Sequence, residues 1–191
     1  FLLGAFADIA AALGVEVVYQ DLALCDNLDI VENMFLGREL KHRGMLDEAR
    51  METMARDALK SLSVRTVKSV RQTVSSLSGG QRQTVAIAKS VLWNSKVVLL
   101  DEPTAALGVA QTRQVIDLVR RLADQGVGVV LISHNMLDVF EVADRICALY
   151  LGRVAADVKT ADVTHSQIVE LITAGRSGSL GLAPAEAAES M

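Results

Sequence analysis

The sequence predicts an α/β fold, with a parallel-sheet core and an inserted α-helical subdomain. Two short, continuously apolar runs at 97–100 and 127–132 are typical of strands that are buried on both faces. An amphipathic helix at 109–124 separates them, and this order favours parallel pairing through a crossover connection. The stretch 21–93 shows helical patterns instead. A chain of 191 residues suits one domain of ordinary size with a small subdomain.

The composition describes a globular protein with an aliphatic core. Hydrophobic residues make up 51% of the chain, whereas aromatic residues contribute only 4%. A formal net charge of −4 gives no general basic field, so we expect no nucleic-acid partner. The most apolar run, 1–19, is interrupted by Asp8 and Glu16, and no transmembrane helix is predicted. Cys25 and Cys147 lack metal-ligand spacing and are expected to be free thiols.

Caps and breakers set the elements of the first half of the chain. In order, we expect a short helix at 8–13, a strand at 15–19, helices at 30–36 and 46–62, and an irregular connection at 63–76. Gly14 ends the first helix, while Asp29 and Gly37 are the expected cap and stop of the second. Gln20 follows the strand directly.

The second half alternates strands and helices. In order, we expect helix 80–92 capped by Ser78, strand 97–100, helix 109–124, strand 127–132, helix 136–143, a third sheet strand at 145–150, its hairpin partner at 153–158, helix 166–173 capped by Thr164, and a frayed tail from Gly175. Leu151 and Gly152 form the expected hairpin turn. Strands and helices in this order predict a parallel sheet with crossover helices.

Polar side chains follow several of the predicted strands. Ligands of parallel α/β sheets bind at the carboxyl ends of the strands. Asp101, Glu102, Ser133 and His134 lie at such ends, and Gln20 is placed in the same way. This coincidence, more than any one residue, indicates a functional site.

Asp101 and Glu102 are two adjacent carboxylates at the end of an aliphatic run. Neighbouring strand residues point to opposite faces, so one carboxylate can reach a Mg²⁺ shell while the other reaches an attacking water. A metal-bound triphosphate needs both. The alternative is a solvated acidic turn, but Pro103 and Thr104 after the four aliphatic residues favour function.

Ser78, Gly79 and Gly80 have the composition of a phosphate-binding turn. Glycine lets the backbone approach a ligand closely, and the following helix presents free N–H groups and its positive dipole end to an anion. Ser-Gly-Gly alone would favour an ordinary helix start with Ser78 as the N-cap. The longer Leu-Ser-Gly-Gly-Gln-Arg-Gln that includes Gln81, followed closely by the Asp-Glu strand, is much more specific.

These motifs resemble the nucleotide-binding subunit of ATP-binding cassette (ABC) transporters, which has a P-loop NTPase-like fold. Residues 77–81 match the family's signature motif, and 97–102 resemble its Walker B strand. The resemblance implies catalytic roles for Glu102 as the base, His134 as the switch histidine and Gln20 as the Q-loop glutamine. It further implies ATP contacts for Ser78, Gly79, Gly80 and Gln81, and Mg²⁺ contacts for Asp101 and Gln20.

The residue sequences of several motifs are similar to those of the simple-sugar importers, the ribose and xylose class. These are Tyr-Gln-Asp-Leu-Ala-Leu at 19–24, Asn-Met-Phe-Leu-Gly-Arg-Glu at 33–39, Ser-His-Asn-Met at 133–136 and Val-Ala-Asp-Arg at 142–145. The resemblance implies a head-to-tail pair of ATP-binding subunits, membrane permease subunits and, indirectly, a periplasmic sugar-binding protein. It implies a peripheral position on the cytoplasmic face of the inner membrane.

The sequence departs from the family pattern in two places. It contains no G-x-x-x-x-G-K-[S/T] Walker A loop, whose place is before Gln20, and we expect that segment upstream of Phe1. That loop supplies most phosphate contacts, so this polypeptide alone is expected to bind ATP weakly and not to hydrolyse it. The missing strand should also leave an unpaired sheet edge, which is expected to lead either to self-association or to a rearranged, compact fragment. Gly108 stands where many members have an Asp that couples the two sites.

The predicted organisation is an ATPase-core remnant at 1–20, a helical signature subdomain at 21–93, the rest of the core at 94–175, and a flexible tail at 176–191. The leading hypothesis is the C-terminal part of a sugar-importer ATPase. One alternative is a binding module that pairs with an intact ATPase or permease without catalysis. An ABC protein of DNA repair or translation is a third reading, which the short segment at 21–76 and the acidic charge disfavour.

Overall fold

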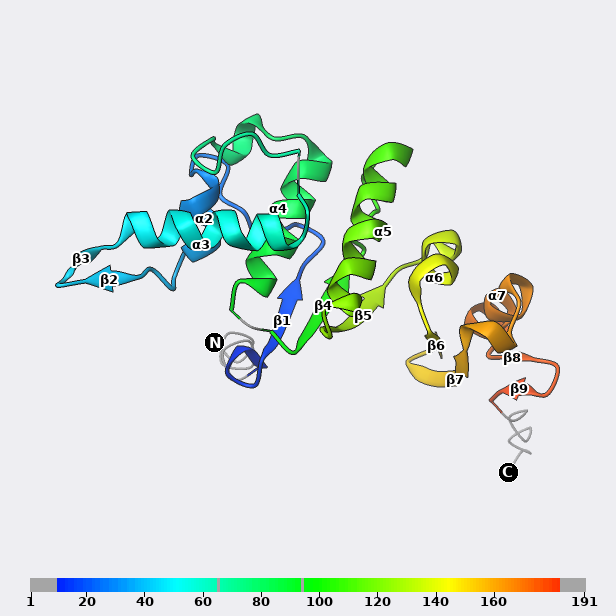
Figure 1. Cartoon of the computed structure of the whole chain (residues 1–191). Coiled ribbons are helices and arrows are strands. Elements are labelled where there is room, and N and C mark those ends of the chain that lie inside the picture. Colours follow the sequence, from blue (N-terminus) through cyan, green and yellow to red (C-terminus); the bar gives the residue numbers. More distant parts are fainter. Residues whose placement is uncertain (1–9, 65, 94, 183–191) are drawn as a thin grey trace, which may run out of the picture. The chain divides into compact units, whose positions relative to one another are not determined.

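The computed structural model describes residues 10–64, 66–93 and 95–182. The chain forms two compact units that divide between His134 and Asn135 (Figure 1), and each is treated by itself. The predicted helix at 8–13 lies partly outside the described residues, and 10–12 are helical. No helix in the described part of the chain combines the length and the apolar character needed to cross a membrane.

A three-stranded parallel sheet forms the centre of the first unit. Its strands are β1 (Val15–Val18), β4 (Val97–Asp101) and β5 (Gly128–Ile132), in the order β1-β4-β5. Val18 pairs with Leu100, and Asp101 pairs with Ile132. All three carboxyl ends therefore meet at one edge, as the sequence predicts.

One face of this sheet is covered and the other is open among the described residues. On β4, Val98 and Leu100 are fully buried, whereas the alternate residues are only half-buried. On β5, Val130 is 49% exposed and Ile132 is 46% exposed. The prediction that both strands are buried on both faces is therefore wrong for β5. An apolar run can arise at a strand that has only one covered face, so the run alone does not fix the burial.

Helix α5 (Val109–Asp124) connects β4 to β5 and has the predicted bounds. Its buried residues are Val115, Ile116, Leu118, Val119 and Leu122, which recur at helical spacing. The chain leaves the helix through Gly126, which has a φ of +84°. This left-handed backbone is the reason that glycine ends the helix.

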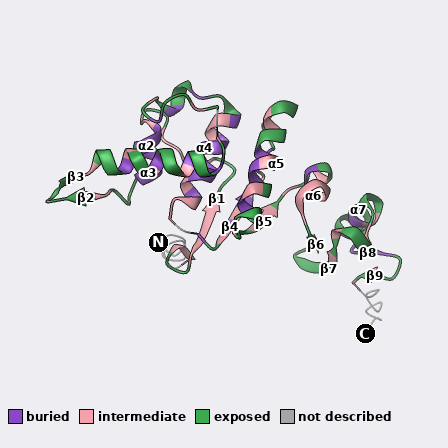
Figure 2. Cartoon of the chain, in the orientation of Figure 1, coloured by how far each residue is buried: buried purple, intermediate pink, exposed green. Residues whose placement is uncertain are grey.

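Three helices, α2 (Ile30–Phe35), α3 (Glu48–Ser61) and α4 (Gly79–Val91), form the helical part of this unit. Asp29 and Ser78 cap α2 and α4, and both caps are reciprocal boxes with a side chain three residues later. The helix predicted at 46–62 begins later than expected. Leu46 belongs to an exposed hairpin of β2 (Lys41–His42) and β3 (Met45–Leu46), which turns at Arg43 and Gly44 (Figure 2).

The side chain of Asn33 holds the segment that enters α2. It is fully buried. Its Oδ1 accepts a hydrogen bond from the backbone N–H of Cys25 at 2.7 Å. Its Nδ2 donates to the carbonyl oxygens of Cys25, Leu28 and Asp29 at 2.9, 3.3 and 3.0 Å. One buried amide therefore satisfies several backbone groups of a loop that has no regular structure.

The predicted irregular connection at 63–76 contains one short 3₁₀ helix, η1 (Val74–Ser76). Arg71 fixes it to the helices by ion pairs with Asp29 at 3.3 Å, Glu48 at 3.2 Å and Glu52 at 2.8 Å. The hydrogen bond from Arg71 is the main reason that the pKa of Glu52 is lowered, and the same bond raises the pKa of Arg71. A segment without regular structure is thus held by side-chain charge.

The second unit contains α6 (Met136–Val142), β6 (Arg145–Tyr150), β7 (Arg153–Lys159), η2 (Thr160–Asp162), α7 (His165–Ala174), β8 (Arg176–Ser177) and β9 (Leu180–Gly181). Its buried core consists of Val139, Ile146, Ala148, Ala155, Ile168 and Leu171. The predicted hairpin through Leu151 and Gly152 is confirmed. Placing 145–150 in the parallel sheet is wrong, because among the described residues β6 pairs only with β7, in antiparallel fashion.

The end of α7 differs from the tail that composition predicts. Gly175 ends the helix with a φ of +76°, and a Cβ there would lie 2.7 Å from the ring of Tyr150. The strands β8 and β9 then pair as a short antiparallel hairpin. Residues 183–191 lie outside the described part of the chain.

Candidate functional site

The sheet places three predicted site residues just beyond its carboxyl edge. Gln20 comes two residues after β1, Glu102 directly follows β4, and His134 comes two residues after β5. Because β4 lies between the other two strands, Glu102 has the central position. The structure joins Glu102 to His134, whereas the exposed side chain of Gln20 makes no hydrogen bond within the described residues.

Glu102 and His134 form a close pair. The Nδ1 atom of His134 lies 2.8 Å from Oε1 of Glu102, and the backbone N–H of His134 donates to the same oxygen at 3.0 Å. The glutamate side chain is 18% exposed and the histidine side chain 79% exposed. The second oxygen, Oε2, is buried and has no hydrogen-bond partner among the described residues. One oxygen thus orients the carboxylate, and the other is an unused acceptor.

The backbone of Glu102 is strained, and no sequence pattern predicts this strain. Its φ is +46°, a left-handed conformation that non-glycine residues adopt at a cost of about 1–3 kcal/mol. Its N–H donates to the carbonyl of Ile132 at 2.9 Å, so the chain turns immediately after the last pair of β4 and β5. Such strain in a polar residue at a strand end is frequent at functional sites.

Asp101 is the last residue of β4 and is half-buried. No group of three or more His, Cys, Asp or Glu side chains in the described part of the chain is arranged to hold a metal ion. Mg²⁺ in nucleotide sites needs only one or two protein oxygens, because water and phosphate supply the others. The carboxylate of Asp101 fits such a partial ligand set as one protein oxygen.

The predicted signature turn is the N-terminus of α4. The hydroxyl of Ser78 accepts from the backbone N–H of Gln81 at 3.4 Å, and the Gln81 Oε1 accepts from the N–H of Ser78 at 2.9 Å. The Nε2 of Gln81 also donates to the carbonyl of Thr66 at 2.6 Å. This last contact crosses fifteen residues of sequence, and no sequence pattern predicts it.

The two glycines of this turn also have a packing role. A Cβ on Gly80 would lie 3.0 Å from the side chain of Gln111 on α5, and one on Gly79 would lie 3.4 Å from Leu107. A side chain at Gly80 would therefore require Gln111 to shift by a few tenths of an ångström, and glycine lets the first turns of α4 and α5 approach without that shift. The first N–H groups of α4 have no acceptor within their own helix, so the turn can still accept an anion.

The comparisons with known proteins agree with this architecture. The family model described as "ABC transporter" matches residues 9–105. The fructose import ATP-binding protein FrcA of Rhizobium meliloti is 47% identical over 87% of this chain and 67% of its own length. The xylose/arabinose import ATP-binding protein XylG of Sulfolobus acidocaldarius is 40% identical over 91% of this chain and 68% of its own. The ribose import ATP-binding protein RbsA 1 of Rubrobacter xylanophilus is 39% identical over 88% of this chain and 33% of its own length.

Solved structures show the same fold. The dimeric post-hydrolysis state of the ATP-binding cassette MJ0796, bound to ADP and Pi, is 26% identical with a TM-score of 0.64, covering 80% of this chain and 67% of the other. CbiO1 from Clostridium perfringens has a TM-score of 0.68 at 23% identity, and the match covers 84% of this chain and 63% of CbiO1. The fold is therefore that of a P-loop NTPase-like ABC cassette, with a parallel-sheet core. By its family match and its sugar-import relatives, this chain belongs to the ABC transporter family.

Proposed function

We propose that this chain supplies the signature turn and the Walker B carboxylates of an ATP-hydrolysing subunit that drives carbohydrate import. The observation that carries the proposal is the oriented Glu102 carboxylate, with Oε1 held by His134 and Oε2 buried without a partner. ATP would supply the phosphoanhydride bond that is cleaved, with Mg²⁺ as its counter-ion. The relatives with sugar-import names support the carbohydrate assignment.

In this proposal each residue has a distinct task. Glu102 accepts a proton from the attacking water at Oε2, which has no donor among the described residues and becomes accessible to water when the carboxylate turns out of its buried position. His134 keeps the carboxylate in position through Oε1. Asp101 is the last residue of β4, and Gln20 lies just beyond the neighbouring strand β1. These two side chains hold Mg²⁺. Ser78, Gly79, Gly80 and Gln81 present the first turn of α4 to the phosphates of a nucleotide.

The proposal includes partners that this chain does not contain. A second ATP-binding subunit would face the signature turn. Membrane permease subunits would respond to the closure of the two ATP-binding subunits, and a periplasmic sugar-binding protein would deliver the sugar to the permease. The subunit would then lie peripherally on the cytoplasmic face of the membrane. The organisation into segments 1–20, 21–93, 94–175 and 176–191 remains our proposal for how these tasks divide along the sequence.

The test is Glu102→Gln, assayed in a fusion of this chain to the phosphate-binding segment of a sugar-import relative. ATP turnover should fall about 10²–10⁴-fold, the usual scale of a positioned acid–base group, while ATP binding persists. Asp124→Asn, which removes an exposed carboxylate at the end of α5, is the control and should leave turnover unchanged. An unchanged rate in Glu102→Gln would exclude Glu102 as the base.

A second candidate function is a binding module that offers its signature turn to a complete partner without catalysis. The observation that favours it is that the signature turn is held in place by its own reciprocal bonds between Ser78 and Gln81 and needs no contact with Glu102. Isothermal titration of the chain with Mg-ATP should then show weak binding, and micromolar affinity would contradict this. Mixing the chain with an intact relative and measuring ATPase activity would separate the two functions, because only a module that pairs productively changes the partner's rate.

A further inference from the structure

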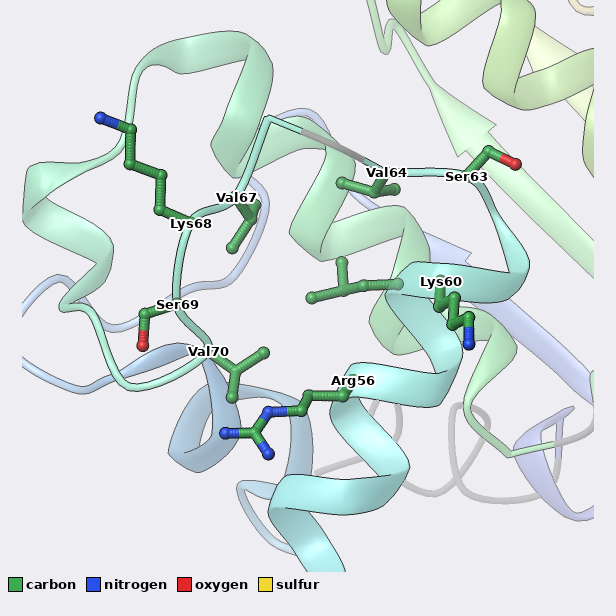
Figure 3. A pocket seen from close by; sticks show the side chains of 9 residues that line it. Arg56, Lys60, Ser63, Val64, Val67, Lys68, Ser69 and Val70 are labelled. Atoms are coloured by element: carbon green, nitrogen blue, oxygen red, sulfur yellow. The ribbon is translucent and has the colours of Figure 1, made fainter.

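A pocket of about 500 Å³ lies between the last two turns of α3 and the connection that follows them (Figure 3). It belongs to the first unit and includes none of the predicted site residues. The lining residues are Arg56, Leu59, Lys60, Ser63, Val64, Val67, Lys68, Ser69 and Val70. This volume falls within the range of small-molecule sites.

Four apolar side chains form part of the pocket wall and come from two elements. Leu59 on α3 is buried, and Val64, Val67 and Val70 belong to the connection. In Figure 3 these valines point into the space in front of α3, and Arg56 extends from the helix toward Val70. The pocket can therefore accept a hydrocarbon group against its wall.

Three of the lining residues, Arg56, Lys60 and Lys68, are cationic. Arg56 and Lys60 are four residues apart and share one face of α3. The Arg56 side chain is 64% exposed, and its ion pair with Glu52 is therefore weak and exchangeable. Among the described residues, Lys60 forms no ion pair. An anionic group in the pocket would be attracted by these lining cations while an attached apolar group contacts the valines.

The connection that forms one wall is bonded to the signature turn. Thr66, between Val64 and Val67, accepts the 2.6 Å hydrogen bond from Nε2 of Gln81. The other end of the same amide accepts from the N–H of Ser78. A ligand that moves the backbone at Thr66 therefore acts directly on the side chain that caps α4.

We propose that this pocket binds a small organic anion with an apolar body, such as a medium-chain carboxylate, and that its occupancy is coupled to the signature turn through Thr66 and Gln81. The pocket would then be an effector site outside the nucleotide site. Such coupling is reciprocal, so a nucleotide partner at the signature turn would change the affinity for the anion by the same factor. Only this second part rests on the proposed function.

The binding part is tested with octanoate as the probe, followed by backbone amide shifts of the full chain in solution. Octanoate should give saturable shifts at Val64, Val67 and Val70. Arg56→Gln should weaken the affinity about tenfold, the scale of one charge-assisted hydrogen bond, whereas Arg50→Gln on an exposed part of the same helix should not. Lys60→Gln should weaken it as well.

Two neutral or compact probes complete this test. Octanol lacks the charge and inorganic phosphate lacks the apolar body, so each should bind at least tenfold more weakly than octanoate. Equal binding of octanol, an Arg56→Gln variant with wild-type affinity, or no saturable shift with octanoate would each overturn the proposal.

The coupling part is tested in Gln81→Ala. In the wild-type chain octanoate should also shift the amide of Ser78, and in Gln81→Ala that shift should vanish while the shifts at Val64 and Val67 remain. A Ser78 shift that persists in Gln81→Ala would refute the coupling. None of these measurements depends on ATP hydrolysis, so their failure is distinguishable from failure of the proposed ATPase function.

Discussion

Replacing Asn33 with Ala should strongly destabilise the first unit. The side chain is fully buried and bonds to the backbone of Cys25, Leu28 and Asp29. Alanine removes the acceptor for one N–H and both amide hydrogens that serve three carbonyl oxygens. At about 1 kcal/mol for each of three net hydrogen bonds, the free energy of unfolding should fall by about 3 kcal/mol. That is a large share of the 5–15 kcal/mol that stabilises a typical domain.

Urea unfolding followed by tryptophan fluorescence measures this loss of stability in the first unit, which contains both Asn33 and the tryptophan. Trp93 is the single tryptophan of the chain, and its ring meets that of Phe35 edge to face at 5.5 Å between centroids. Asn27→Ala is the matched control, since Asn27 is an exposed residue of the same loop, and its effect should stay within about 0.5 kcal/mol. A loss below about 1 kcal/mol in Asn33→Ala would show that water replaces the amide and that the buried network does not hold the loop.

Two further predictions concern a glycine and an ion pair. Gly175→Ala should cost about 3 kcal/mol, because a left-handed backbone at φ +76° costs about 1–2 kcal/mol and the new Cβ meets a tyrosine ring at 2.7 Å. Gly152→Ala, at φ +77° with no described atom within 4 Å of the new Cβ, should cost only about 1 kcal/mol in a urea titration followed by the backbone amide signals of α7 and β6, and equal losses would show that the ring moves aside. The pKa of Glu52 is lowered chiefly by its hydrogen bond from Arg71, so its contribution to stability is present above pH 4.5 and is lost as the pH falls through the lowered value. Arg71→Gln should therefore flatten the acid limb of stability against pH, and an unchanged limb would contradict the reasoning.

The sequence predicts those elements that local chemistry determines. Helix α5 has the expected bounds because its apolar stripe is regular and a glycine follows it. The caps Asp29, Ser78 and Thr164 are confirmed, since each bonds to the N–H three residues later. These signals act over a few residues, so they can be recognised without knowing the rest of the fold.

Features that depend on distant partners were not predictable in this way. The hairpin of β2 and β3 has two residues in each strand, too few to show alternation. The pairing of β6 with β7, and the open face of β5, depend on which strand lies beside each of them. An apolar run has the same appearance in either case.

The candidate site shows the same limit. Strand order predicts that Glu102 and His134 share one edge of the sheet, and the structure places them in contact at 2.8 Å. The left-handed backbone of Glu102 and the bond from Gln81 to Thr66 are not visible in the sequence. Both arise from the way the chain turns after its neighbours are in place.

The backbone of Glu102 has a consequence for any attempt to improve this protein by selection. Glycine and asparagine adopt a φ of +46° far more easily than glutamate does. A library screened only for expression or heat resistance should therefore enrich those two residues at this position and discard the carboxylate. Selection that retains the carboxylate must reward turnover itself, because folding alone favours its loss.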